Sequence, residues 1–172
     1  MKKIKLILMT IVMCGMFLII LTSNDVIASN GQVMIKPVSG TVTQEFSGSH
    51  SGIDIGAPLG TPIYAPSDGT VEACGWGSYG EGYYIVISHI PGDSNPYRYY
   101  CPLENWTKYY HLSSILVQQN QSVTQGQLIG RVGKTGNATG YHLHFEIREN
   151  GRYGTAVNPR EYIRFGDGKD IW

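Results

Sequence analysis

The sequence predicts an all-β fold, in which antiparallel sheets form a sandwich or a barrel-like domain with long groove-forming loops. The chain of 172 residues holds 22 glycines and 12 tyrosines, and only 15% of its residues are charged. That composition favours strands and turns over helices. No amphipathic helical pattern of ten or more residues stands out, whereas short apolar runs recur between clusters of Gly, Pro, Asn and Ser.

The individual strands are predicted from these runs, taken in chain order. The candidates are TVTQEF (41–46), PIYAP (62–66), GTVEACG (69–75), YYIVISHI (83–90), TKYYHL (107–112), SVTQGQLIGRVG (122–133) and YHLHFEIRE (141–149). The later segment NPREYI (158–163) is expected to form a short helical turn, because proline favours the first turn of a helix.

The first 28 residues read as a secretory signal peptide. Lysines in MKKIK precede an apolar run from Leu6 to Leu21, and Val26 and Ala28 stand where small residues precede a cleavage site. The alternative is an uncleaved membrane anchor, although a span needs about 20 apolar residues. We therefore expect one exported domain over 29–172, with its core at about 40–163. It would lie in the cell wall or outside the cell, and at a membrane only if the leader is retained.

Charge and cysteine content exclude some classes of function. The formal net charge is zero, which gives no basic surface for nucleic acid. Cys74 and Cys101 could form a disulfide in an oxidising compartment or remain free thiols. They lack the CxxC spacing typical of zinc–thiolate sites. No feature of the sequence determines an oligomeric state.

Two of the five histidines stand two residues apart in a predicted strand. In TGYHLHFEIRENG, the odd positions from Tyr141 to Ile147 are apolar, and the even positions are His142, His144, Glu146 and Arg148. Alternation therefore places both histidines on the face opposite the core, with Cβ atoms roughly 7 Å apart. They could converge on one metal ion, or they could simply belong to a polar strand face.

A second pair, His50 and Asp54, lies four residues apart in HSGIDIG. The glycines and the following proline argue against a helix. In a straight strand the two residues would be about 13 Å apart, which is too far to share an ion. Shared binding therefore requires a bend near Ser51–Gly52, which glycine permits.

The remaining histidines are His111, at the end of a tyrosine-rich strand, and His89, in a strongly apolar run. His89 could be a structural histidine as easily as a site residue. Together, two imidazoles and a carboxylate suit Zn²⁺, and three protein ligands leave a position for water. Zinc lowers the pKa of such a water to about 7, and neighbouring histidines could then assist amide hydrolysis.

The connection from Pro91 to Thr107 is much longer than usual hairpin loops. Its aromatic residues suggest the wall of a substrate groove, for which Tyr100, Trp106 and Tyr109 are the candidate residues. The segment Trp76–Tyr84 is expected to line the same groove. A surface loop without a binding role is the alternative.

Taken together, the motifs resemble the lysostaphin-type (LytM-domain) zinc endopeptidases from about His50 to Ile163. The blocks HSGIDIGAPLGTPIYAPSDGTV, YIVISH, YYHLSS, VTQGQLIGRVGKTGNATGYHLHFEIRENG and VNPREYI follow in the family's order. The resemblance implies one zinc ion per chain, bound by His50, Asp54 and His144, and catalytic roles for His111 and His142. Tyr141 stands where proline is common, and the loop after His89 is longer than in compact members.

The resemblance implies an exported zinc metalloendopeptidase that hydrolyses peptide crosslinks or stem peptides of bacterial peptidoglycan. One alternative is a non-enzymatic domain of the same fold that binds or activates another wall hydrolase, but such domains typically lack the metal ligands. Another is a sugar-transport phosphocarrier module, which the export signal makes implausible.

Overall fold

The structure is a computed structural model, and it describes residues 34–89 and 105–169. The predicted leader (1–28), Tyr100, Cys101 and most of the predicted long loop lie outside these ranges. Within the described ranges, no helix is long and apolar enough to cross a membrane. The domain boundary at residue 29 therefore remains a prediction.

The regular secondary structure of the described residues consists almost entirely of antiparallel strands, which confirms the predicted fold class. The strands are β1 (Thr41–Gln44), β2 (Ile53–Gly56), β3 (Pro62–Tyr64), β4 (Gly69–Gly77), β5 (Gly82–Ser88), β6 (Asn105–Ile115), β7 (Ser122–Val123), β8 (Leu128–Val132), β9 (His142–Glu149) and β10 (Thr155–Val157). One 3-10 helix, η2 (Pro159–Glu161), follows β10 and lies in the predicted helical turn.

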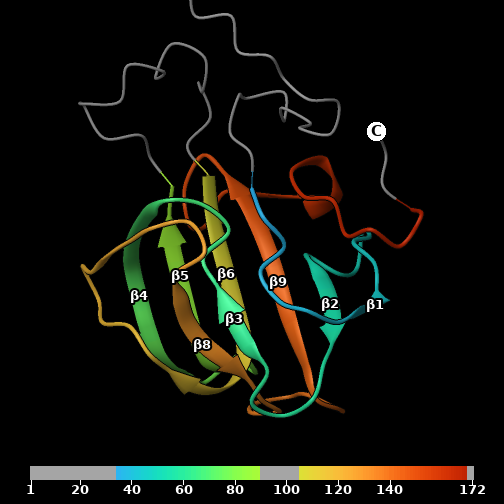
Figure 1. Cartoon of the computed structure of the whole chain (residues 1–172), viewed down its shortest axis with the longest axis horizontal. Coiled ribbons are helices and arrows are strands. Elements are labelled where there is room, and N and C mark those ends of the chain that lie inside the picture. Colours follow the sequence, from blue (N-terminus) through green and yellow to red (C-terminus); the bar gives the residue numbers. More distant parts are fainter. Residues whose placement is uncertain (1–33, 90–104, 170–172) are drawn as a thin grey trace, which may run out of the picture.

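The strands form two layers that meet at β6 (Figure 1). The larger layer has the order β1-β2-β9-β6-β5-β4-β7, with β10 on β9. The first part of β6 pairs with both β5 and β9, and its last residues pair with β8. β8 in turn pairs with β3, and these two strands fold over one face of the larger layer.

The hydrophobic core lies between the two layers. Leu143, Phe145 and Ile147 of β9 are completely buried, as the alternation predicts, and they pack with Ile63 from the small layer. Tyr141 departs from the prediction because β9 begins at His142, and the tyrosine is 51% exposed. Burial of the apolar face of β9 directs its polar face away from the core.

Three elements differ from the predicted strands. The segment 122–133 is interrupted by a turn in which the Gln127 amide donates to the Thr124 carbonyl and Gly126 has a φ of 78°. This turn separates β7 from β8. The strands β2 and β10 were not predicted, since each is too short to show a clear alternation.

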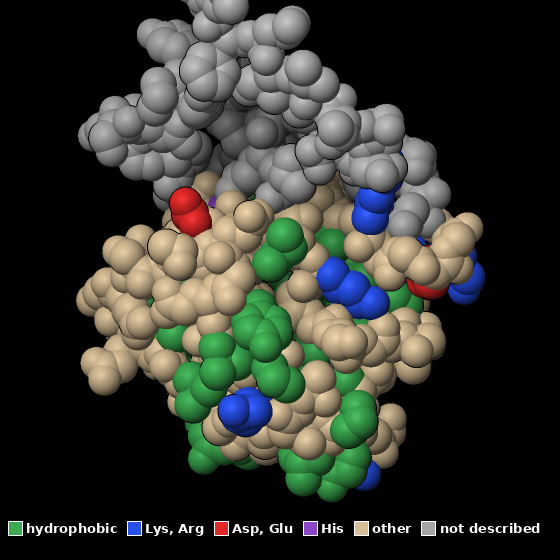
Figure 2. Space-filling view, in the orientation of Figure 1, with side chains coloured by type: hydrophobic (Ala, Val, Ile, Leu, Met, Phe, Trp, Pro, Cys, Tyr) green, Lys and Arg blue, Asp and Glu red, His purple; other side chains and the backbone are tan. Residues whose placement is uncertain are grey.

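The surface in Figure 2 carries apolar side chains gathered over β3 and β8, with few acidic groups. Tyr64 of β3 is 38% exposed and belongs to the exposed large apolar residues. Cys74, in β4, forms no disulfide within the described residues, and its Sγ lies 3.7 Å from the Val117 carbonyl oxygen. A disulfide with Cys101 and a free thiol both stay open as expectations, because Cys101 lies outside the described ranges.

Candidate metal centre

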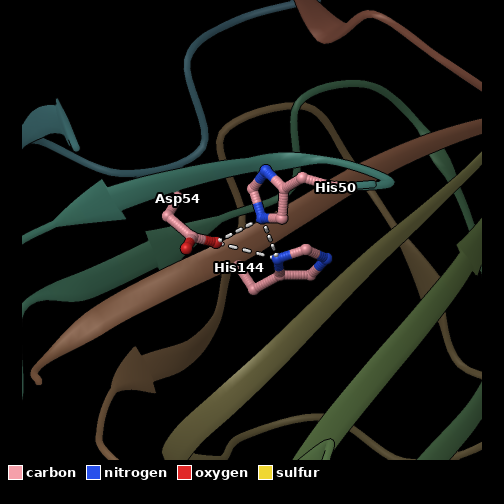
Figure 3. Close-up of side chains that lie close together, drawn as sticks. All are labelled: His50, Asp54 and His144. Carbon is pink, nitrogen blue, oxygen red and sulfur yellow. Dashed lines mark hydrogen bonds and ion pairs between the residues drawn. The ribbon is translucent and has the colours of Figure 1, made fainter. Parts of the chain in front are cut away.

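The two strands β2 and β9 place a carboxylate opposite an imidazole. In their antiparallel pairing, Asp54 lies directly across from His144. Both side chains point away from the core, because the neighbouring Ile53, Ile55 and Phe145 fill it. Asp54 Oδ1 and His144 Nδ1 are 2.8 Å apart (Figure 3).

The third residue, His50, reaches the same point from a turn that precedes β2. Ser47 and His50 exchange main-chain hydrogen bonds across a tight turn, and the chain then bends at Ser51–Gly52. The predicted bend is therefore present. Gly52 serves it by close approach, because a Cβ there would lie 2.3 Å from the Phe145 carbonyl oxygen.

Hydrogen bonds to carbonyl or carboxylate groups determine which nitrogen of each ligand ring faces the centre. His50 Nδ1 lies 2.8 Å from the Glu45 carbonyl oxygen, which can only accept, so Nδ1 carries the hydrogen. His144 Nε2 lies 3.2 Å from Glu146 Oε1 and donates to it. In the neutral rings, His50 Nε2 and His144 Nδ1 therefore present lone pairs.

These lone pairs and Asp54 Oδ1 converge on one point. His50 Nε2 lies 3.1 Å from Asp54 Oδ1 and 3.1 Å from His144 Nδ1. Three acceptors this close are stable only with a cation or a proton between them. Zinc held tetrahedrally at about 2.0–2.1 Å separates its ligand atoms by about 3.3 Å. The donor set and its spacing therefore fit a zinc ion with only a small outward adjustment.

The protonation of the metal-free centre follows from the same contacts. Burial disfavours a charged His144, but hydrogen bonds to Asp54 and Glu146 outweigh burial and raise its pKa to about 9. Burial would likewise raise the pKa of Asp54, yet the hydrogen bond from His144 and nearby histidine charges lower it. Without a metal, His144 thus carries the proton that separates it from Asp54.

Glu146 supports His144 from behind and was not assigned a role by the sequence, although the alternation placed both on one face. Its carboxylate accepts from Ser51 Oγ at 2.5 Å and from Arg148 Nε at 2.8 Å, and Lys108 Nζ lies 3.8 Å away. Burial opposes ionisation, but the hydrogen bonds lower the pKa of Glu146 to about 2. A carboxylate partner of this kind orients a metal-binding histidine and raises its basicity.

His111 reaches the centre through an irregularity in β6. Tyr109 and Leu112 are both completely buried in the core, although residues three apart in a regular strand face opposite sides. At this point β6 slips register against β5, and His111 has a φ of 66°. The extra residue is a β-bulge, which lets Tyr110 and His111 both lie on the side of the metal ligands.

His111 and His142 lie together beside the three candidate ligands. Their ring centroids are 4.8 Å apart, and that of His111 is 6.2 Å from that of His144. Carbonyl groups again determine the tautomers, since His111 Nδ1 donates to Thr135 and His142 Nδ1 donates to Gly140. Each ring therefore presents Nε2. Burial lowers the pKa of His111 and favours its neutral form.

The structure thus brings together all five histidine and aspartate residues that the sequence singled out for the site. His89 lies elsewhere, buried between the Asp68 carbonyl and the Thr107 hydroxyl, and is a structural histidine. Tyr110, which the sequence analysis did not single out, stacks on His144 with ring centroids 5.4 Å apart.

The groove residues fit less well. Tyr109 was predicted to line a groove, but it is completely buried beside Phe145, so this prediction is wrong. Trp106 belongs to β6 rather than to a loop, and it is only 7% exposed, with Nε1 donating to Glu72 at 2.5 Å. Tyr100 lies outside the described ranges. Trp76, near the end of β4, is 59% exposed, and its place in a groove wall stays a prediction.

Comparison with known proteins identifies the family of the chain. Residues 48–159 match the model of peptidase family M23. The peptidoglycan DD-endopeptidase ShyC of Vibrio cholerae is 40% identical over 126 residues, which cover 73% of this chain but only 24% of that protein.

Solved peptidase structures resemble this chain as well. The catalytic domain of lysostaphin from Staphylococcus simulans superposes with a TM-score of 0.55 at 32% identity, covering 72% of this chain and 86% of that one. A zinc-containing peptidase from Vibrio cholerae gives a TM-score of 0.62 at 30% identity, covering 74% and 39%. From the match of the family model over most of its described residues, the chain belongs to peptidase family M23.

Proposed function

We propose that this protein is an exported zinc endopeptidase that hydrolyses peptide crosslinks or stem peptides of bacterial peptidoglycan. The observation that carries the proposal is the convergence of three acceptor atoms, from His50, Asp54 and His144, with no donor between them in the neutral state. The relatives named as a peptidoglycan endopeptidase and as lysostaphin support the substrate class.

Metal binding and proton transfer fall to different residues of the chain. His50 Nε2, Asp54 Oδ1 and His144 Nδ1 would hold the ion. When bound, zinc supplies a Lewis acid that lowers the pKa of a water molecule to about 7. Amide hydrolysis also needs a proton removed from the attacking water and a proton given to the leaving nitrogen.

His111 and His142 are placed to carry out these proton transfers. Each presents Nε2 on the side of the ligands, and each has its Nδ1 fixed by a carbonyl. The lowered pKa of His111 keeps Nε2 available as a proton acceptor near neutral pH. His142, whose Nε2 lies 3.8 Å from Asp54 Oδ2, is the second candidate for donating or accepting a proton.

A non-enzymatic binding domain of the same fold is the alternative function. It would have no need of neutral histidine tautomers fixed toward a common point, so the five assembled side chains favour the enzyme. Export is proposed from the apolar run Leu6–Leu21 with its lysines and small-residue site, since peptidoglycan lies outside the cytoplasmic membrane.

The test is digestion of purified cell walls and defined muropeptides by the chain without residues 1–28. We expect loss of wall turbidity and new peptide termini, with the scissile bond read by mass spectrometry. A chelator should abolish the activity, zinc should restore it, and His144→Ala should be inactive. Full activity of His144→Ala, or of the protein after complete zinc removal, would contradict the proposal.

A further inference from the structure

We propose that Arg160, close to the C-terminus, is a positioning residue for His50, and that it acts through Glu45. The inference rests on the proposed function in taking His50 as a metal ligand. It adds that the orientation of this ligand depends on a segment that follows the last strand, more than a hundred residues away in the sequence.

His50 differs from the other two candidate ligands in how it is held. Asp54 and His144 lie opposite each other on paired strands, so the sheet fixes them. His50 lies on a turn before β2, and the neighbouring Ser47, Gly48 and Ser49 are exposed. A Cβ added at Gly48 would meet nothing within 4 Å. The turn itself therefore offers little packing that could hold the His50 ring.

On the side that faces away from the centre, the ring is held by one main-chain group. His50 Nδ1 donates to the Glu45 carbonyl oxygen at 2.8 Å. This hydrogen bond fixes the hydrogen on Nδ1 and aims Nε2 at Asp54 and His144. Displacement of the carbonyl would free the ring to rotate or to change tautomer, and either change would remove the Nε2 lone pair from the centre.

Arg160 fixes the residue that carries this carbonyl. Its Nε and one terminal nitrogen each donate to a Glu45 carboxylate oxygen at 2.9 Å, which is a bidentate pair. The other side of the guanidinium is held by Asp167, at 2.9 Å and 2.7 Å. Arg160 is only 3% exposed, and its guanidinium lies over the Phe165 ring, 5.2 Å from its centroid.

The C-terminal segment thus forms a clamp, defined as Arg160 with Asp167 and Phe165, on the loop between β1 and His50. In Figure 1 this segment lies beside β1 and β2. A bidentate arginine pair restricts both partners more than a single lysine contact does. The geometry of the Arg160–Glu45 pair therefore fits a role in holding the Glu45 main chain in place. A single, solvent-screened ion pair on the surface would not restrict the main chain in this way.

The test compares Arg160→Gln, Glu45→Gln and the double variant in the full-length protein. Tyr162→Phe is the matched control, because it removes a hydroxyl contact to Glu149 from the same C-terminal segment and leaves the Arg160–Glu45 pair in place. Zinc affinity is measured by competition with a chromophoric chelator. The His50 tautomer is read from ring ¹⁵N shifts of the metal-free protein, and thermal unfolding reports stability.

We expect each single variant to bind zinc about 10-fold more weakly or worse, in the range seen when partners of metal-binding histidines are removed. The double variant should be no weaker than the worse single variant, because both changes break one connection. His50 should show mixed tautomers in these variants and a single Nδ1–H form in Tyr162→Phe, which should also bind zinc normally.

Glu45→Gln keeps the inference testable if Arg160→Gln does not fold, since the Glu45 side chain is 41% exposed. Folded variants with unchanged zinc affinity and an unchanged His50 tautomer would overturn the inference. Equal weakening in Tyr162→Phe would also overturn it, since the effect would then be general destabilisation. A wild-type chain that binds no zinc would instead overturn the proposed function, and the ¹⁵N readout would decide the inference.

Discussion

Zinc binding to this centre should release a proton from His144, so the apparent affinity should rise with pH. In the metal-free protein the His144 ring has a pKa of about 9, and its proton lies on the nitrogen that faces Asp54. A metal ion can bind that nitrogen only after the proton leaves. Below the pKa, each unit by which the pH falls therefore lowers the apparent zinc affinity about tenfold.

The size of the effect follows from the distance between the working pH and this pKa. At pH 7 the ring lies two units below a pKa of about 9, so zinc should bind roughly 100-fold more weakly than at the high-pH limit. This corresponds to about 3 kcal/mol of binding free energy. Competition by the proton thus offsets a substantial part of the zinc affinity at neutral pH.

Isothermal titration calorimetry in two buffers of different ionisation enthalpy measures the released protons directly. We expect close to one proton per zinc near neutral pH, and a chelator-competition series should show affinity levelling off near the His144 pKa. Glu146→Gln removes one of the hydrogen bonds that raise this pKa, so its plateau should begin at lower pH. Equal heats in both buffers together with a flat affinity profile would refute the reasoning.

Three further outcomes are expected. His111→Gln should lower kcat on muropeptides by about 10²–10⁴-fold while leaving zinc affinity unchanged, and a parallel loss of zinc would contradict its role as a proton acceptor. Burial lowers the pKa of His89 to about 4 from 6.5, so an unfolded chain takes up a proton that the folded chain excludes. The free energy of unfolding should therefore fall by up to about 3 kcal/mol as the pH drops from 6.5 to about 4. In urea unfolding of the metal-free protein, His89→Gln should lack this dependence of stability on pH. Gly52→Ala should destabilise the fold by about 1–3 kcal/mol because its Cβ would lie 2.3 Å from the Phe145 carbonyl oxygen, whereas Gly48→Ala, in open space, should unfold like the wild type.

The sequence predicted those parts of the site that depend on local alternation. The period of two from His142 to Ile147 correctly separated the site face of β9 from its core face. The required bend at Ser51–Gly52 followed from the reach of an extended chain, and it is present. The choice of ligands among the histidines came from family resemblance, because spacing alone left several metal-binding sets open.

Features that depend on tertiary contacts were missed or wrong. The bulge at His111 gives a non-glycine residue a φ of 66°, and the contacts that hold it come from the Glu81 and Thr135 carbonyls of other elements. Tyr109 was assigned to a groove because it is near an aromatic loop, whereas its pairing opposite Phe145 of β9 places it in the core. The pairing of Glu45 with Arg160 joins residues 115 apart, a separation at which no local pattern operates.

The pairing of β2 with β9 carries a consequence for how this domain tolerates change. The same register that sets Asp54 against His144 also sets Ile53 against Phe145 and Ile55 against Leu143. A single-residue insertion or deletion within β2 would turn the carboxylate into the interior and an isoleucine toward the ligands. Stability and chemistry would then be lost in one step, so we expect viable length variation to accumulate in the turns outside this strand pair, and chains that retain the fold to retain the metal geometry.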